Sequence, residues 1–155
     1  MAYFLHGEWN AFNIYKGKLS IFNYKVFITH NTPDIIGVQE EASYRTKYKW
    51  CNMGISKNIG NIGQCFDIDW EDRCDSKGNG ANNSHNYRVK IVSNNLMLQI
   101  VTSNNETQFS FGNWVRTNMD ETQLNQELIS AAKNGDTVVY NWLKKGGFDM
   151  TKINS

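Results

Sequence analysis

The sequence lacks most of the residue patterns that mark small proteins held together by cross-links. It has one proline, Pro33, and three cysteines, Cys51, Cys65 and Cys74, without a Cys-x-x-Cys pair. An odd number of cysteines without that spacing argues against a disulfide framework and against a zinc site. A chain of 155 residues is long enough to bury an apolar core, so we expect neither a metal nor any other cofactor.

Long apolar runs and a charge of one sign are also missing. No run approaches the roughly 18 residues of a transmembrane helix, and residues 1–7 lack the basic start and apolar stretch of a signal peptide. The formal net charge of +1 gives no reason to expect nucleic acid or an anionic membrane as a partner. We therefore expect a soluble, cytoplasmic protein that binds neither nucleic acid nor membrane.

Aromatic residues are abundant instead, with Phe 8, Tyr 7 and Trp 5. Such side chains suit the pleated surface of a β-sheet. Apolar and polar residues alternate along the first part of the chain, and near Thr117-Asn118 the apolar spacing changes to three or four. This change predicts an antiparallel β domain at residues 1–117 and a helix-turn-helix hairpin at 118–155, with helices near 119–134 and 137–145.

The clearest strand signal lies in the middle of the chain. Three alternating segments are separated by Asn-Asn pairs at 94–95 and 104–105, and asparagine tolerates the positive φ of a tight hairpin turn. Folding about the first pair places Ile91 opposite Leu98, and folding about the second places Leu98 opposite Phe111. The shared strand then has the same apolar face in both hairpins, which predicts three sequential antiparallel strands.

Earlier segments add further strands. Basic residues alternate with other residues along 44–50, and acidic residues alternate with apolar ones along 62–71. If the two strands are neighbours, these charges would pair across the outer surface. Residues 22–28 form another strand, and we interpret 72–86 as a long polar loop. The seven or eight strands predict an up-and-down β-barrel, with a β-sandwich as the alternative.

Enzyme signals are poor. The histidines lie far apart in the sequence: His6, His30 and His85. Glu40 and Glu41 are adjacent, so in a strand they face opposite ways and form no carboxylate pair. We find no Ser/His/Asp or Cys/His arrangement, which predicts that the protein is not an enzyme.

The loop predicted at 72–86 is the one place where chemistry would gather. Residues 75–80 resemble the start of a calcium loop, but Lys77 occupies a ligand position and Asn86 stands where the closing glutamate belongs. We therefore expect a polar turn without metal. A catalytic site would instead require three residues of this loop to face a cleft together: Cys74, Asp75 and His85.

The two ends of the β domain carry a family resemblance. Gly7-Glu8-Trp9 opens the first strand and Arg116 follows the last, which resembles the lipocalins and the wider calycin group. In that group the Trp closes one end of an eight-stranded barrel and a late basic residue lies against its ring. The resemblance implies structural roles for Trp9 and Arg116, and an internal cavity for a small apolar ligand.

Inward positions of the predicted strands supply the candidate lining of that cavity. Core packing predicts the same residues inside, so a filled core and a ligand cavity both remain open. The candidates are Phe22, Tyr24, Tyr48, Phe66, Ile91, Leu98 and Phe109. On this basis the first hypothesis is a non-catalytic protein that binds a small apolar ligand.

The C-terminal segment resembles a single ankyrin repeat. The matching residues in 127–152 include Ala131-Ala132, which allow two helices to approach, and Gly135, which ends the first helix. Ankyrin repeats grip partner proteins, so the alternative hypothesis is an interaction or assembly module with Tyr140 and Trp142 as contact residues. One repeat is fewer than the three or so that such units need, so the hairpin covers either the β domain or a partner.

Overall fold

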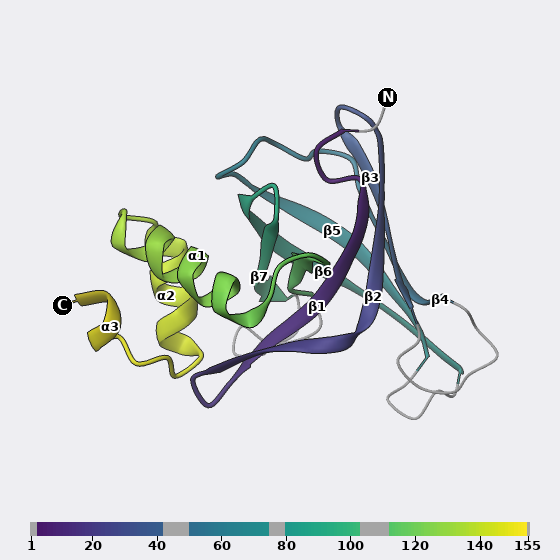
Figure 1. Cartoon of the computed structure of the whole chain (residues 1–155). Helices are drawn as coiled ribbons and strands as arrows, with labels where there is room; N and C mark the ends of the chain where they lie inside the picture. Colours follow the sequence, from purple (N-terminus) through teal and green to yellow (C-terminus); the bar gives the residue numbers. More distant parts are fainter. Residues whose placement is uncertain (1–2, 42–49, 75–79, 103–111, 155) are drawn as a thin grey trace.

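The computed structural model describes residues 3–41, 50–74, 80–102 and 112–154. In these residues eight antiparallel strands follow one another around a closed barrel, and β8 returns to pair with β1 (Figure 1). The strands are β1 Gly7–Tyr15, β2 Lys18–Thr32, β3 Ile35–Glu41, β4 Trp50–Ser56, β5 Cys65–Cys74, β6 Gly80–Ser93, β7 Leu96–Thr102 and β8 Trp114–Arg116. The helices are α1 Glu121–Lys133, α2 Thr137–Lys145 and α3 Thr151–Asn154. The predicted barrel and helical hairpin are confirmed, and the sandwich alternative is wrong.

Apolar residues at every second strand position point into the barrel, as the two-residue period requires. In its middle the rings of Trp70 and Trp114 stack with centroids 5.9 Å apart. The buried members of this interior cluster include Trp9, Ala11, Val26, Ile28, Ile36, Val38, Phe66, Ile68, Trp70, Val89, Ile91, Met97 and Trp114. The described side chains of the interior therefore pack against one another as a core.

Trp9 and Arg116 lie at the end of the barrel where β1 begins. The Arg116 guanidinium carbon is 4.1 Å from the centroid of the Trp9 ring, which is the contact that the sequence predicted. Arg116 also donates to the carbonyl oxygens of Phe4 and, at 2.9 Å, His6, while the Trp9 Nε1 donates to that of Leu5 at 3.0 Å. The N-terminal segment is thereby tied across this end, and burial lowers the pKa of Arg116.

The helices cover the outer face of the barrel around β1, β7 and β8 (Figure 1). Asp120 caps α1 in a capping box with Gln123, and Asp136 caps α2 by accepting from the Val139 backbone N–H at 3.1 Å. The buried residues between barrel and helices include Phe12, Leu19, Leu96, Leu98, Val115, Leu124, Leu128, Val139, Trp142 and Leu143. None of the described helices combines the length and apolar character that spanning a bilayer requires.

The hairpin turn at Asn94-Asn95 forms as predicted, but the register that we derived from it is wrong by one residue. Ile91 pairs with Met97 and Lys90 with Leu98, because the register shifts directly after Ile91. An extra residue on one strand exchanges the two faces up to the next shift, which lies between Arg88 and Val89. Leu98 therefore lies outside the barrel, under the helices, rather than inside it.

The acidic face of β5 also has a different partner strand from the predicted one. Asp67 pairs with Arg88 at 3.0 Å, and Asp69 accepts from the Asn86 side chain at 3.0 Å, so the partner is β6. Residues 44–49 of the predicted basic strand at 44–50 lie outside the described residues, as does the third hairpin strand at 107–111, whereas Trp50 begins β4.

The long polar loop predicted at 72–86 is wrong as well. β5 continues to Cys74 and β6 begins at Gly80, and this hairpin pairs Trp70 with His85. The prediction ends the strand where the alternation of apolar and polar residues ends. Polar side chains can nevertheless continue a strand when they have hydrogen-bond partners inside a barrel. The calcium-like residues 75–79 lie outside the described residues.

Candidate functional site

The inner face of the barrel changes from apolar to polar where β3 and β5 end, opposite the end at which β1 begins. Glu40 follows Val38 on the inner face of β3, and Asp72 follows Trp70 on that of β5. His85 on β6 faces inward with them, because it pairs directly with Trp70. We call Glu40, Asn52, Asp72, His85 and Tyr87, together with the Trp70 indole, the polar end.

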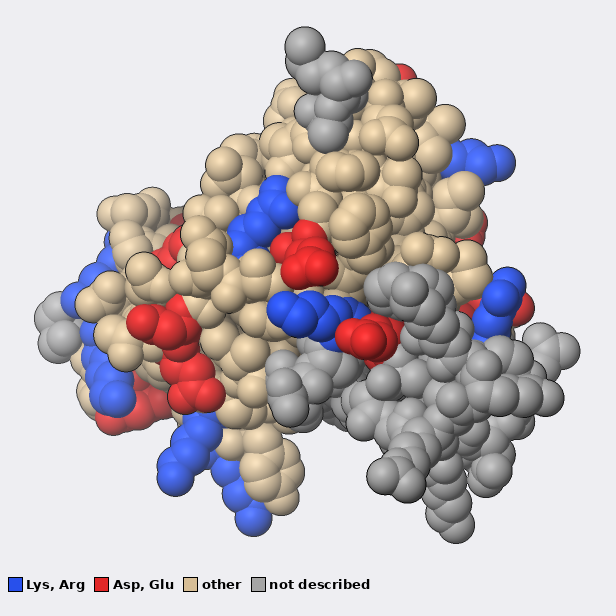
Figure 2. All heavy atoms as spheres, turned by 45° about the vertical axis from the view of Figure 1, so that its right-hand side comes forward, with Lys and Arg blue, Asp and Glu red and all other residues tan. Residues whose placement is uncertain are grey.

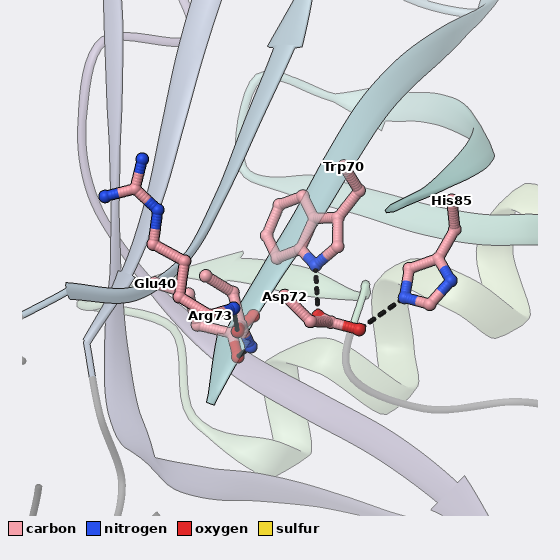
Figure 3. Close-up of polar contacts among 6 residues, drawn as sticks. Glu40, Trp70, Asp72, Arg73 and His85 are labelled. Carbon is pink, nitrogen blue, oxygen red and sulfur yellow. Dashed lines mark hydrogen bonds and ion pairs between the residues drawn. The ribbon is translucent and has the colours of Figure 1, made fainter. Parts of the chain in front are cut away.

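Asp72 is the centre of the polar contacts at this end (Figure 3). Its Oδ1 accepts from the Trp70 Nε1 at 2.9 Å, and its Oδ2 bonds to the His85 Nε2. The Tyr87 ring lies 5.7 Å from His85 and 5.6 Å from Trp70, centroid to centroid. The Asp72 and His85 side chains are 23% and 19% exposed, so water reaches this pair, whereas Trp70 is buried.

Glu40 has the most unusual environment at the polar end. Its side chain is buried, its Oε1 accepts from the Asn52 Nδ2 at 3.1 Å, and its Oε2 has no hydrogen-bond partner within the described part of the chain. Burial raises the pKa of Glu40 to about 8, the charge of Asp72 adds to this, and the Asn52 hydrogen bond opposes it. At neutral pH Glu40 is therefore mostly protonated, which leaves a carboxyl oxygen free to bind something else.

Tyr87 responds to the same surroundings. Burial raises its pKa above the ordinary value, and the carboxyl groups of Asp72 and Glu40 raise it further. Burial is the largest cause of the raised pKa for both groups, and the neighbouring carboxyl groups add to it.

Gly54 makes room for the indole that organises the site. It lies directly opposite Trp70 on β4, and a Cβ at this position would be 2.5 Å from the Trp70 Cε3 and 2.7 Å from the Ile68 Cγ2. The missing side chain lets the ring lie across β4. The Trp70 Nε1 is thereby held against Asp72.

Arg73, the basic residue next to Asp72 in sequence, does not neutralise the site. Its guanidinium extends away from Asp72 and His85 (Figure 3), and its Nε lies 3.6 Å from Glu71. In the described residues no Lys or Arg pairs with Glu40 or Asp72. No group of three or more described His, Cys, Asp or Glu side chains is placed to hold a metal ion.

A concave region lies on the outer face of β2 to β6, with a volume of about 830 Å³. Gly37 forms part of its floor, and a Cβ there would meet nothing within 4 Å. Met53 and Ile55 line it together with the Glu71–Arg73 ion pair. Figure 2 shows charged side chains of both signs interspersed over the described part of the surface in view. This hollow is open and lacks the buried polar group that distinguishes the polar end.

The predicted cavity residues divide into three groups. Phe66 and Ile91 are inside the barrel, where they belong to the packed interior cluster. Leu98 is on the outer face because of the register shift after Ile91, so its assignment to a cavity is wrong. The side chains of the others lie outside the described residues: Phe22, Tyr24, Tyr48 and Phe109.

Trp142 and Tyr140, the predicted interaction residues, differ in exposure. Trp142 is 3% exposed and donates its Nε1 to the Gln99 carbonyl oxygen at 2.9 Å, so it contacts the barrel. Tyr140 is half-buried, and its hydroxyl exchanges hydrogen bonds with the Asn154 side chain at 3.3 and 3.4 Å. The Trp142 side chain is therefore not available on the surface of the folded chain.

Sequence reasoning did not find the polar end, although a signal for it exists. Glu40 and Glu41 do face opposite ways, one buried and one exposed, as predicted. Glu40 continues the inward series of Ile36 and Val38 by the same two-residue step. Extending that series would have placed a carboxyl group inside the barrel.

Comparison with known proteins identifies no relative of this chain. Searches against protein-family models, curated proteins and solved structures found no match. The functional argument for this chain therefore depends on its own residues.

Proposed function

We propose that this protein is a non-catalytic binding protein for a small ligand, which enters the barrel at the polar end. The observation that carries the proposal is the buried Glu40 carboxyl, whose Oε2 has no partner in the described part of the chain. A buried polar atom without a hydrogen bond costs about 1–3 kcal/mol. A ligand that hydrogen-bonds to Oε2 would offset this cost, and the partly exposed Asp72–His85 pair beside it offers a route from solvent.

The apolar part of the ligand would lie against the aromatic side chains of this end. The Trp70 and Tyr87 rings are adjacent and inward-facing, and aromatic surfaces with a few convergent polar groups are typical of small-molecule sites. The opposite end supports this assignment, because Trp9 and Arg116 fill it. The calycin-like function expected from the sequence is thus proposed with one change: the ligand lies at the polar end of the barrel, beyond the packed core.

The alternative is an interaction module that acts through the ankyrin-like hairpin. A partner would have to contact the outward faces of α1 and α2, because Trp142 is buried against the barrel. The half-buried Tyr140 is the remaining candidate contact. Native mass spectrometry of the purified chain would favour this alternative if it detected a stable oligomer that the substitution Tyr140→Ala dissociates.

The proposed function is tested by mass spectrometry of small molecules that organic solvent releases from the folded, purified protein. We expect a compound in near-stoichiometric amount, and its recovery should fall at least tenfold in Glu40→Leu, which removes both carboxyl oxygens. Glu41→Gln is the matched control, because the neighbouring residue faces outward and should leave recovery unchanged. Equal recovery from the wild type and Glu40→Leu, or no compound from any of the three, would contradict the proposal.

A further inference from the structure

The group that decides what chemistry the ligand carries is the buried carboxyl of Glu40. Its Oε1 is occupied by the Asn52 amide at 3.1 Å, and its Oε2 is unpartnered within the described part of the chain. A ligand atom at Oε2 must therefore either donate a hydrogen bond to a carboxylate or accept one from a protonated carboxyl. The surrounding charges distinguish these two cases.

Among the side chains that the structure describes, those facing Glu40 from the adjoining strands are uncharged or acidic, apart from one histidine. Val26 pairs with it on β2 and Asn52 on β4, while Asp72 of β5 and the His85–Tyr87 side of β6 complete the surroundings. The single base among them, His85, is bonded to the Asp72 carboxylate.

The acidic character of this end determines which ion is stable beside Glu40. Burial is the largest cause of the raised pKa values of Glu40 and Tyr87, and the negative potential of the Asp72 charge raises both further. The same potential attracts a cation and repels an anion. At neutral pH the proton on Glu40 occupies the place that a larger cation would take.

We infer that the ligand of the polar end carries a protonated amine, which binds the Glu40 carboxylate beside Asp72. The inference rests on the proposed function and specifies its ligand class. When the ammonium group binds, the carboxyl releases its proton to solvent, so the neutral acid and the ammonium ion become an ion pair and one free proton. The apolar part of the ligand lies on Trp70, where the indole adds a cation–π attraction.

Proton release fixes how the affinity depends on pH. Below the pKa of Glu40, at about 8, each pH unit upward removes competition from one bound proton and strengthens amine binding up to tenfold. A ligand that accepts a hydrogen bond from protonated Glu40 would show the reverse dependence. The sign of the pH effect therefore separates the two cases.

The experiment is isothermal titration of the full chain with benzylamine, benzyl alcohol and benzoate, which share a ring and differ in charge. We expect benzylamine to bind with an affinity that rises roughly 50-fold from pH 6 to pH 8. Measurements in two buffers of different protonation enthalpy should report release of nearly one proton at pH 6. Benzyl alcohol and benzoate should bind at least tenfold more weakly at pH 8.

Glu40→Gln keeps the Oε1 acceptor for Asn52 and removes the charge, so benzylamine should bind at least tenfold more weakly at pH 8, without the pH dependence. Glu41→Gln, the outward-facing control, should behave as the wild type. The wild-type pH profile stands on its own if the Glu40 variant fails to fold.

Any of three outcomes would overturn the inference. If benzyl alcohol or benzoate binds as tightly as benzylamine, or benzylamine weakens as pH rises, the cationic ligand is wrong and the proposed small-molecule site survives. If benzylamine does not bind at pH 8, the inference is also wrong. The solvent-extraction experiment then decides the proposed function independently.

Discussion

Replacing Trp142 by alanine is expected to lower the free energy of unfolding by about 3–5 kcal/mol, the usual cost of truncating a large core side chain. Trp142 is 3% exposed, its ring meets that of Phe12 at 6.1 Å, and its Nε1 donates to the Gln99 carbonyl. The substitution removes the packing and leaves a buried acceptor unpaired. In a chain of this size the melting temperature should fall by roughly 10 °C.

Tyr15→Ala is the matched control, because this aromatic side chain is 66% exposed and its truncation should change stability by less than about 0.5 kcal/mol. Denaturant unfolding of both variants measures the difference. A shift of the melting temperature by under about 2 °C in Trp142→Ala would mean that the hairpin contributes little to the barrel and that its apolar face serves a partner.

The stability of Glu40→Gln relative to the wild type is expected to rise with pH between about 5 and 8. In the folded state the pKa of Glu40 is raised to about 8, mainly by burial, whereas in the unfolded chain it returns to about 4.3. The folded wild type therefore holds a proton that the unfolded chain releases in this range. Its stability falls by up to about 1.4 kcal/mol per pH unit, and glutamine removes this dependence.

The direction follows from which state binds the proton more tightly. The contribution of Glu40 is fully present below the unfolded pKa and is lost as pH rises toward the folded pKa of about 8. Chemical denaturation of both proteins at pH 5, 6, 7 and 8 gives the difference directly. A substitution that only disturbs packing would shift stability equally at each pH, so a constant difference would contradict the buried, proton-binding carboxyl.

The fold was largely predictable because its signals are local. The two-residue alternation predicts the strands of the barrel, and the change of period near Asn118 predicts the helices. The residues around Trp9 and Arg116 predict the contact between these two side chains. The bulge after Ile91 was not predictable from alternation, because both faces of β7 are apolar. Leu96 and Leu98 pack under the helices while Met97 packs inside, so neither register conflicts with the apolar pattern.

The polar end was missed for a different reason. Asp72 and His85 interrupt their apolar series and were read as loop residues, yet inside the barrel they bond to one another and to Trp70. Asp72 and His85 come together only because β5 pairs with β6. Apolar alternation in the sequence does not define this pairing beyond the last apolar residue of each strand. To recognise Glu40 as a buried acid, one must know that it continues the inward-facing positions of β3 and that Asn52 lies beside it.

The most direct test of the central claim, that a small ligand binds at the polar end, is a ¹H–¹⁵N NMR titration of the five tryptophan indole signals. Single Trp→Phe variants assign them, and the titrant is the compound recovered by solvent extraction. The account predicts a saturating shift of the Trp70 signal, whose Nε1 bonds to Asp72, with the signals of Trp9 and Trp142 unchanged. A Trp70 signal that stays fixed while Trp142 shifts, or no shift at any indole, would contradict it.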